Sequence, residues 1–256
     1  MNRNVYMDVM STRSNPVKAF IYGLFSGLVS LPRICIEPFS RTEFGERYFS
    51  FSTCCIYAFV LGMFPLVFLY AASHDAYIDF TIGDLFLHYT TWYVYLIWFM
   101  QKCIGHWKEI KQNGSTFDFE RYSKSSGEIN DFLYEINYKG KYFTTRQIQT
   151  MIEPGLFFLI GLGLTLMTQW IGIVILISSV CYSVSYFESY RRGDNYVLDF
   201  IDHQIANEET VNLLIKDAPK KTTRGFEIMA RKPADRTLRF NLARHTIGYK
   251  PVIKAV

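Results

Sequence analysis

The chain has 256 residues, of which 50% are hydrophobic, 17% aromatic and only 20% charged, and its formal net charge is +4. That length permits one or two soluble domains. The apolar residues, however, are gathered into long stretches without charge, and such clustering argues against soluble domains.

The first apolar stretch, AFIYGLFSGLVSLP at residues 19–32, is 14 residues long. A helix that spans a membrane needs about 20 residues, so this length favours an amphipathic helix at the membrane surface or a re-entrant one. No small-x-small cleavage site follows, so we do not interpret it as a secretory signal peptide.

Three further stretches predict membrane-spanning helices. Residues 50–73 carry no charge and include Pro65, which a span tolerates when neighbouring groups satisfy the carbonyl that proline leaves without a donor. Residues 85–100 are shorter and strongly aromatic. Residues 156–187 contain no charged side chain, yet as one helix they would be about 50 Å long, against a hydrocarbon core of about 30 Å.

The basic residues decide how this last stretch is folded. If residues 152–167 and 170–187 are two helices with a turn at Thr168 and Gln169, the chain crosses four times. All 27 Lys and Arg then lie on one side: 6 in the N-terminal arm, 8 in the middle loop and 13 in the tail. Because basic residues of short loops stay in the cytoplasm, we expect a tight hairpin and two cytoplasmic termini.

These expectations define an all-α polytopic membrane protein of the plasma (inner) membrane. We expect residues 1–49 to be a cytoplasmic arm with the interfacial helix, and residues 50–104 to be the first transmembrane hairpin. Residues 105–151 form a cytoplasmic loop, residues 152–187 a second hairpin that either spans fully or is re-entrant, and residues 188–256 a helical and basic cytoplasmic tail.

The cytoplasmic loop shows two local signals. YEINYKGKYFTT predicts a small β-hairpin around Lys139 and Gly140, since glycine supplies the positive φ that a tight turn requires. Thr144, with Gln147 three residues later, predicts a capping box for a helix that continues through Glu153 and Pro154 into the third span.

The tail begins with a predicted amphipathic helix. Val197, Leu198, Ile201 and Ile205 recur at helical spacing, so one face of this helix is expected to pack and the other to face water. Asn207 predicts the N-cap of a second helix.

Residues 219–256 hold ten Lys and Arg but only two acids, and we expect this segment to dock on a partner protein. Contact with anionic lipid, contact with nucleic acid and a solvated tail that the acidic helix before it partly neutralises remain as alternatives, nucleic acid being the least favoured. The candidate docking residues are Arg224, Phe226, Arg231, Lys232, Arg236, Arg239 and Phe240.

No constellation for chemistry is evident in the sequence. The five histidines are far apart and form no HxxxH or HExxH pattern, and the five cysteines form no CxxC pattern, so we expect no metal site, no cofactor and no catalytic residue. Inside the spans, His88 is the one clearly ionisable residue, whereas transporters usually place several there.

The sequence therefore favours a non-enzymatic structural or scaffolding subunit of a multiprotein membrane assembly, such as a secretion or conjugation system. Its expected partners are other subunits and the lipid bilayer. The alternative is a small channel or transporter that forms a homo-oligomer.

Overall fold

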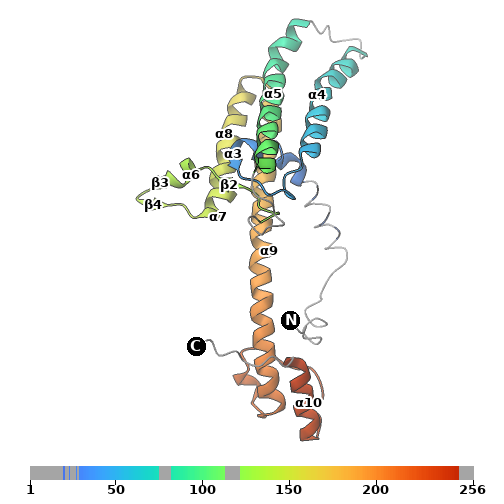
Figure 1. Ribbon diagram of the computed structural model, residues 1–256, viewed down its shortest axis with the longest axis vertical. Helices are drawn as coiled ribbons and strands as arrows, with labels where there is room; N and C mark the ends of the chain where they lie inside the picture. The colour runs from blue at the N-terminus through green and yellow to red at the C-terminus, as the bar shows by residue number, and fades with distance from the viewer. Residues whose placement is uncertain are drawn as a thin grey trace. The chain divides into compact units, whose positions relative to one another are not determined.

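The computed structural model describes residues 20, 23, 27, 29–74, 82–112 and 122–247, and these are mostly helical (Figure 1). The chain forms two compact units, one of Tyr22–Ser189 and one of Tyr190–Val256 with Met1–Ile21. Most of the predicted N-terminal arm and of the connection between the first two spans lies outside the described residues. The described residues at positions 20, 23, 27 and 29–33 are helical.

The helices are α3 (Glu37–Ser40), α4 (Phe51–His74), α5 (Ile82–Gln112), α6 (Asp131–Glu135), α7 (Thr145–Gln147), a π-helix (Ile148–Ile152), α8 (Glu153–Leu166), α9 (Trp170–Leu214), a short 3-10 helix (Lys220–Thr222) and α10 (Arg236–Ile247). The strands are β1 (Arg41–Thr42), β2 (Glu128–Ile129), β3 (Asn137–Tyr138) and β4 (Lys141–Tyr142).

Three of the described helices are long and apolar enough to cross a membrane: Phe51–Phe68 within α4, Thr145–Leu166 through α8, and Trp170–Leu214, which is α9. Much of their surface is apolar and exposed, as on Phe59, Leu159 and Ile177, which suits contact with lipid. α5 is not one of the three, because its tyrosine, histidine and lysine side chains make it more polar than α4.

Where the sequence analysis places a turn, α8 and α9 are joined by residues 167–169 and run antiparallel. Gly161 and Gly172 let the two backbones approach, since a Cβ on Gly172 would lie 2.6 Å from the Gly161 carbonyl oxygen. At the other end of the pair, Ser179 Oγ donates to the Pro154 carbonyl (2.6 Å) and Ser183 Oγ to the Thr150 carbonyl (2.6 Å).

Both prolines inside the long helices have a partner for the carbonyl four residues before them. Pro65 leaves the Leu61 carbonyl without a helical donor, and Trp92 Nε1 of α5 donates to it at 2.9 Å. Pro154 likewise leaves the Thr150 carbonyl without a helical donor, and the Ser183 hydroxyl donates a hydrogen bond to it. The expectation that neighbouring groups would satisfy the carbonyl freed by Pro65 is therefore confirmed.

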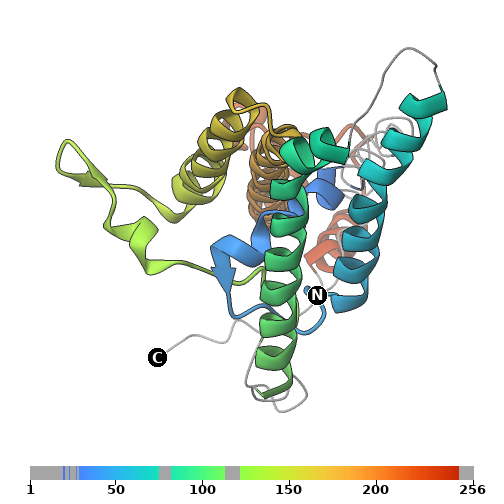
Figure 2. The ribbon, with the colours of Figure 1, turned by 90° about the horizontal axis from the view of Figure 1, so that it is seen from above.

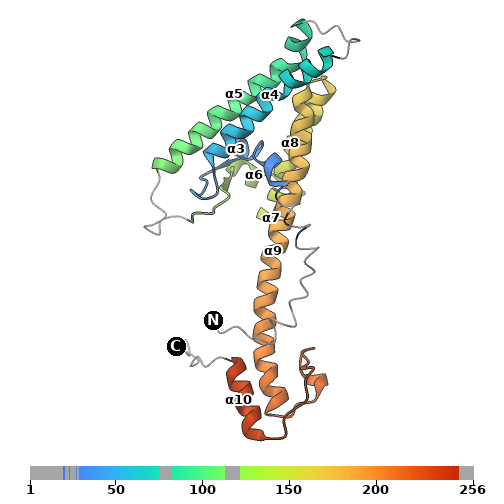
Figure 3. The same cartoon turned by 90° about the vertical axis from the view of Figure 1, so that its right-hand side faces the viewer.

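α5 is the central helix of the first unit. Figure 2 shows it between α4 on one side and the α8–α9 pair on the other. Tyr89, Trp92 and Leu96 of α5 pack against Ile171 and Ile175 of α9. Lower on the helix, Phe99 and Cys103 pack against Cys54 of α4. Figure 3 shows α4 and α5 as a pair inclined to α8.

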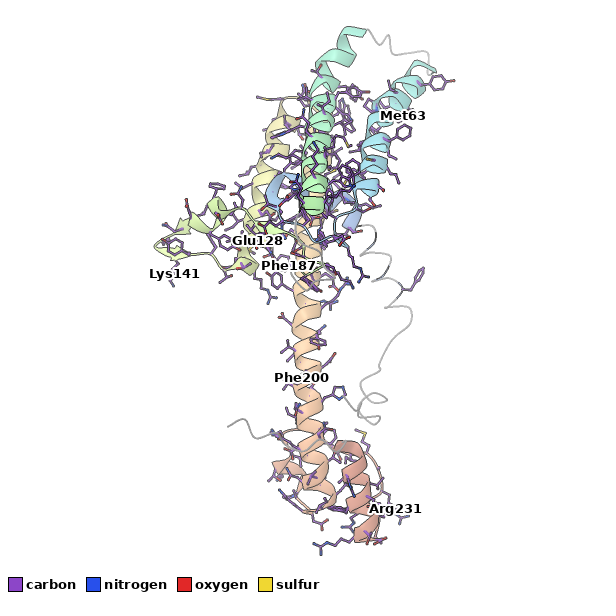
Figure 4. All side chains as sticks on the ribbon, in the orientation of Figure 1. Met63, Glu128, Lys141, Phe187, Phe200 and Arg231 are labelled. Carbon is purple, nitrogen blue, oxygen red and sulfur yellow. The ribbon has the colours of Figure 1, made fainter. Side chains whose placement is uncertain are left out.

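The loop after α5 folds as its local signals predict. Asn137–Tyr138 and Lys141–Tyr142 pair antiparallel around Lys139 and Gly140, which both have positive φ (53° and 76°). Thr144 and Gln147 form the predicted capping box, and the helix continues through the π-helical turn into α8. Figure 4 shows Lys141 at the hairpin, which projects away from the long helices of this unit.

A second strand pair joins the N-terminal arm to this loop. Arg41 pairs with Ile129 and Thr42 with Glu128. Gly127 lies at the contact with a φ of 83°, and a Cβ there would lie 2.7 Å from the Thr42 carbonyl oxygen. A residue with a side chain would therefore force the strands apart.

The predicted break at Asn207 is wrong, because α9 continues to Leu214 as one helix of 45 residues. An N-cap requires an extended backbone, whereas Asn207 keeps helical geometry inside α9. Ala206 and Thr210, one turn apart on either side of it, are buried, so packing of this part of the helix overrides the local preference.

Candidate functional site

Residues 220–239 fold back on the end of α9, and ion pairs hold them there. Arg224 donates from Nε to Glu209 Oε1 (2.6 Å) and from Nη2 to Glu208 Oε2 (2.5 Å). Lys232 and Arg239 both pair with Asp217, just after α9 ends. Three candidate docking residues therefore have acidic partners within their own chain.

Local signals also shape this segment. Asp235 accepts a hydrogen bond from the Thr237 backbone N–H (2.9 Å), as an N-cap for α10 does, and Pro233 precedes it. Thr223 is buried, and its hydroxyl donates to the Phe226 carbonyl (2.8 Å), which closes the turn that contains Gly225. The basic segment is thus a folded element of the second unit.

Two acids of these ion pairs, Asp217 and Glu209, have a lowered pKa. The hydrogen bond from Lys232 lowers the pKa of Asp217 below its ordinary value, and the positive charge of Arg239 adds to the effect. The hydrogen bonds from Asn212 and Arg224 lower the pKa of Glu209 in the same way. Both carboxylates are therefore held ionised.

A pocket of about 400 Å³ lies between the end of α9 and the folded tail. Its walls are mainly apolar and include Leu213, Leu214, Ile228 and Leu242. Arg231 and Lys232 add positive charges to the lining, and Glu227 adds a negative one. The pocket is large enough to take two or three apolar side chains of another protein.

The seven candidate docking residues are only partly brought together. Arg231 and Lys232 line the pocket, Arg236 is exposed at the start of α10, and Phe240 is 54% exposed on the same helix. Phe226 is half-buried and so is less available as an anchor than expected. Their role as a docking surface stays a prediction.

The sequence analysis predicts that one face of α9 packs after the apolar segment, and the structure differs from this prediction. Every residue from 191 to 202 is exposed. These include large apolar side chains: Val197 is 54% exposed, Phe200 44% and Ile201 45%. Figure 4 labels Phe200 on this stretch of α9. The face predicted to pack is therefore exposed at Val197, Leu198 and Ile201.

The first unit contains a buried ion pair that the sequence analysis missed. Arg41 of β1 donates to both carboxylate oxygens of Glu153, from Nε at 3.1 Å and from Nη2 at 2.9 Å. Both side chains are essentially inaccessible to solvent. Arg41 Nη1 also donates to the Ser126 carbonyl and hydroxyl, and its guanidinium lies 4.4 Å from the Tyr186 ring centroid. The pair joins the arm, the loop and α8.

A second charged cluster is next to it. Arg33 donates to Glu37 and to Ser185 Oγ (2.8 Å), while Tyr48 donates its hydroxyl to Glu37 Oε1 (2.7 Å). His106 Nε2 lies 2.9 Å from the Pro38 carbonyl oxygen, which ties α5 to α3. Burial makes each of these groups costly to leave unpaired, so the clusters fix where the arm docks.

One signal in the sequence could have indicated the Arg41–Glu153 pair. Glu153 is an isolated acid at the entrance of a charge-free stretch, next to a proline, and a carboxylate there needs a cation. The sequence does not say which of the 27 basic residues supplies it.

Nothing in these clusters forms a nucleophile with its base. His106 faces a backbone carbonyl and Glu109, and Arg41 and Glu153 neutralise each other. Within the described residues, no group of three His, Cys, Asp or Glu side chains could hold a metal ion. Comparisons with known proteins give no further direction: no family model, no curated protein and no solved structure matches the chain.

Proposed function

We propose that this protein is a non-enzymatic structural or scaffolding subunit of a multiprotein membrane assembly, such as a secretion or conjugation system. The observation that carries the proposal is the exposed apolar face of α9 formed by Val197, Leu198, Phe200 and Ile201. Such a patch on a helix marks a site for another protein.

The length of α9 supports this interpretation. At about 1.5 Å per residue, its 45 residues extend roughly 68 Å, about twice the hydrocarbon thickness of a bilayer. If residues 170–187 span the membrane, residues 191–202 lie in water. Exposed apolar side chains are then unfavourable unless an apolar helix face of another subunit covers them.

We further propose four spans, with α5 as the fourth and with both termini in the cytoplasm of a plasma-membrane protein. Two observations support α5 as a membrane span. The indole of Trp92 donates a hydrogen bond to the Leu61 carbonyl of α4, and the buried residues of α5 pack on α9. A helix enclosed on two sides by apolar helices can cross the membrane with more polar residues than an isolated one.

The tail is proposed as a second docking element, for an acidic segment of a partner. Lys232 and Arg239 form ion pairs with Asp217, and the charge of Arg236 also acts on that carboxylate. Arg231 and Arg236 form no direct ion pair within the described residues. Arg231 lines the apolar pocket. An amphipathic partner segment that presents apolar side chains to the pocket and carboxylates to these arginines fits both features.

The experiment is co-purification of the full chain with its neighbours after mild extraction. Changing Val197, Phe200 and Ile201 together to Gln is expected to reduce the partner yield at least tenfold, because the apolar face is lost while helix propensity is kept. The matched control changes Asn195 and His203, on the opposite face, to Gln and is expected to leave the yield unchanged.

The tail is tested separately. Arg231→Glu with Arg236→Glu should weaken co-purification, whereas Lys139→Glu with Lys141→Glu, the same charge change on the loop hairpin, should not. Deleting residues 219–256 should leave the protein in the membrane but abolish association. A pure homo-oligomer with no other protein, unaffected by the α9 variant, would contradict the scaffold and favour the channel.

A further inference from the structure

A small pocket of about 120 Å³ lies in the first unit, where the N-terminal arm meets the first turn of α4. Its lining combines one carboxylate with aromatic and apolar side chains and with residues of α4. The lining residues are Ile34, Glu37, Pro38, Phe44, Tyr48, Phe49, Ser50, Thr53 and Cys54.

The carboxylate in this lining is only partly used by the protein. Glu37 is 7% exposed, and three hydrogen bonds reach it, from Arg33, Tyr48 and Tyr186. All three end at Oε1. Within the described part of the chain, Oε2 receives none, so one oxygen of a buried carboxylate next to a pocket is left with acceptor capacity.

The positive charge around Glu37 is also incompletely available to it. Arg41 is the nearest cation after Arg33, but both of its outer donors are directed at Glu153 and Ser126. Desolvation raises the pKa of Glu37 above its ordinary value, in spite of Arg33 and Arg41, which lower it. Arg33 is therefore the cation that compensates this carboxylate, and Oε2 is left to accept a hydrogen bond from a donor in the pocket.

The size and the walls of the pocket restrict what that donor can be. A pocket of about 120 Å³ has room for a small organic ammonium group. Phe44, Tyr48 and Phe49 line the pocket with aromatic rings. Phe44 stacks on the other two rings, and the Arg33 guanidinium lies 5.5 Å from the Tyr48 ring centroid, so this aromatic group already holds one cation. Ser50 and Thr53 add hydroxyl oxygens that accept hydrogen bonds from N–H donors.

We propose that this pocket binds a primary ammonium group, with Glu37 Oε2 as its anionic partner. Thr53 and Cys54 lie in the first turn of α4, a helix long and apolar enough to cross a membrane, so the proposal places the pocket at the level of lipid headgroups. An ethanolamine headgroup is one source of this chemistry, and a free alkylammonium ion in solution is the other.

The test uses the purified full chain in detergent and methylammonium chloride as the probe, with sodium chloride at equal concentration as the reference. The midpoint of thermal unfolding is expected to rise saturably with methylammonium and not with sodium. Thr53→Leu fills the pocket without touching the charged cluster and should weaken the apparent affinity at least tenfold. Ser52→Leu, the same kind of change at the neighbouring exposed position, should leave it unchanged.

A second variant and a lipid measurement complete the test. Glu37→Gln should also abolish the response, and its folded state is checked by size-exclusion chromatography. The source of the ammonium group is identified by native mass spectrometry of protein from nanodiscs of mixed phosphatidylethanolamine and phosphatidylglycerol. If the protein retains phosphatidylethanolamine and Thr53→Leu does not, the ligand is the lipid headgroup. If only methylammonium gives a response, the ligand is the soluble ion. An equal response to sodium, or an equal response of Thr53→Leu and Ser52→Leu, would overturn the proposal.

Discussion

At the scale of single residues, two prolines determine which side chains must lie opposite them. Each removes the backbone donor of its own position, and inside a membrane helix the carbonyl one turn earlier has no water to turn to. Trp92 supplies the missing donor for Pro65, and Ser183 supplies it for Pro154. These hydrogen bonds therefore join α4 to α5 and α8 to α9 by satisfying a backbone defect.

This dependence predicts a specific coupling between Trp92 and Pro65. Trp92→Phe should lower the free energy of unfolding by about 1–3 kcal/mol, because the Leu61 carbonyl loses its donor. In a Pro65→Ala background the backbone N–H returns, so the same change should cost less. Unfolding in detergent measures both, with Trp98→Phe at a 56% exposed ring as the control. Equal costs in the two backgrounds would show that the hydrogen bond is not the reason for the loss.

At the scale of elements, local sequence signals predicted the structure of short segments correctly. They failed where contacts with residues far apart in the sequence determine the structure. The hairpin turn at Lys139 and Gly140 and the capping box of Thr144 and Gln147 depend only on neighbouring residues, and both form. Asn207 carries a signal equally clear in the sequence, but packing of Ala206 and Thr210 overrides it. The acidic helix before the tail is an alternative partner for its basic residues in the sequence analysis, but the sequence does not show which acids pair with Arg224 and Lys232.

The α8–α9 pair depends on the absence of a side chain at Gly172. A Cβ there would lie 2.5 Å from the Thr165 backbone nitrogen, so Gly172→Ala has to separate the helices and should cost about 1–3 kcal/mol in the free energy of unfolding. Gly163→Ala is the matched control, because a Cβ at that position meets nothing within 4 Å. Thermal unfolding in detergent compares them, and an equal effect would contradict the close packing.

The folded tail should loosen in acid. The pKa of Asp217 and of Glu209 is lowered in the folded state, so their contribution is present above the unfolded pKa values and is lost as the pH falls through the folded ones. Since unpaired carboxyls titrate near pH 4, the loss is expected below about pH 5. Limited pepsin digestion should then cut between residues 217 and 235 more rapidly. Asp217→Asn should already be cut faster at pH 5, and a pH-independent rate would contradict the model.

At the scale of the whole molecule, the charge distribution predicts the topology more firmly than hydropathy does. Three described helices are apolar enough to cross a membrane, and an odd number of spans would place the termini on opposite sides. The 13 basic residues of the tail and the six of the arm favour one side for both, and hence four spans.

Cysteine labelling in intact cells distinguishes four membrane spans from three. Single cysteines at Asp79, which lies outside the described residues, and at Gln169 should react from the external side, while cysteines at Gly127 and at the C-terminus should react only after permeabilisation. The reagent is membrane-impermeant, and the five native cysteines are replaced beforehand. External labelling of the C-terminus would show that α5 does not cross.

The buried pair between Arg41 and Glu153 also sets an order of events during biosynthesis. Its members are 112 residues apart, and at about 5–20 residues per second the ribosome needs roughly 6–22 s to reach the second after the first. Throughout that interval the guanidinium has no carboxylate, and burying it alone would cost about 3–5 kcal/mol. If α4 and α5 insert as a hairpin, the newly made arm has to stay in water beside it until the helix that carries Glu153 arrives and lets it dock.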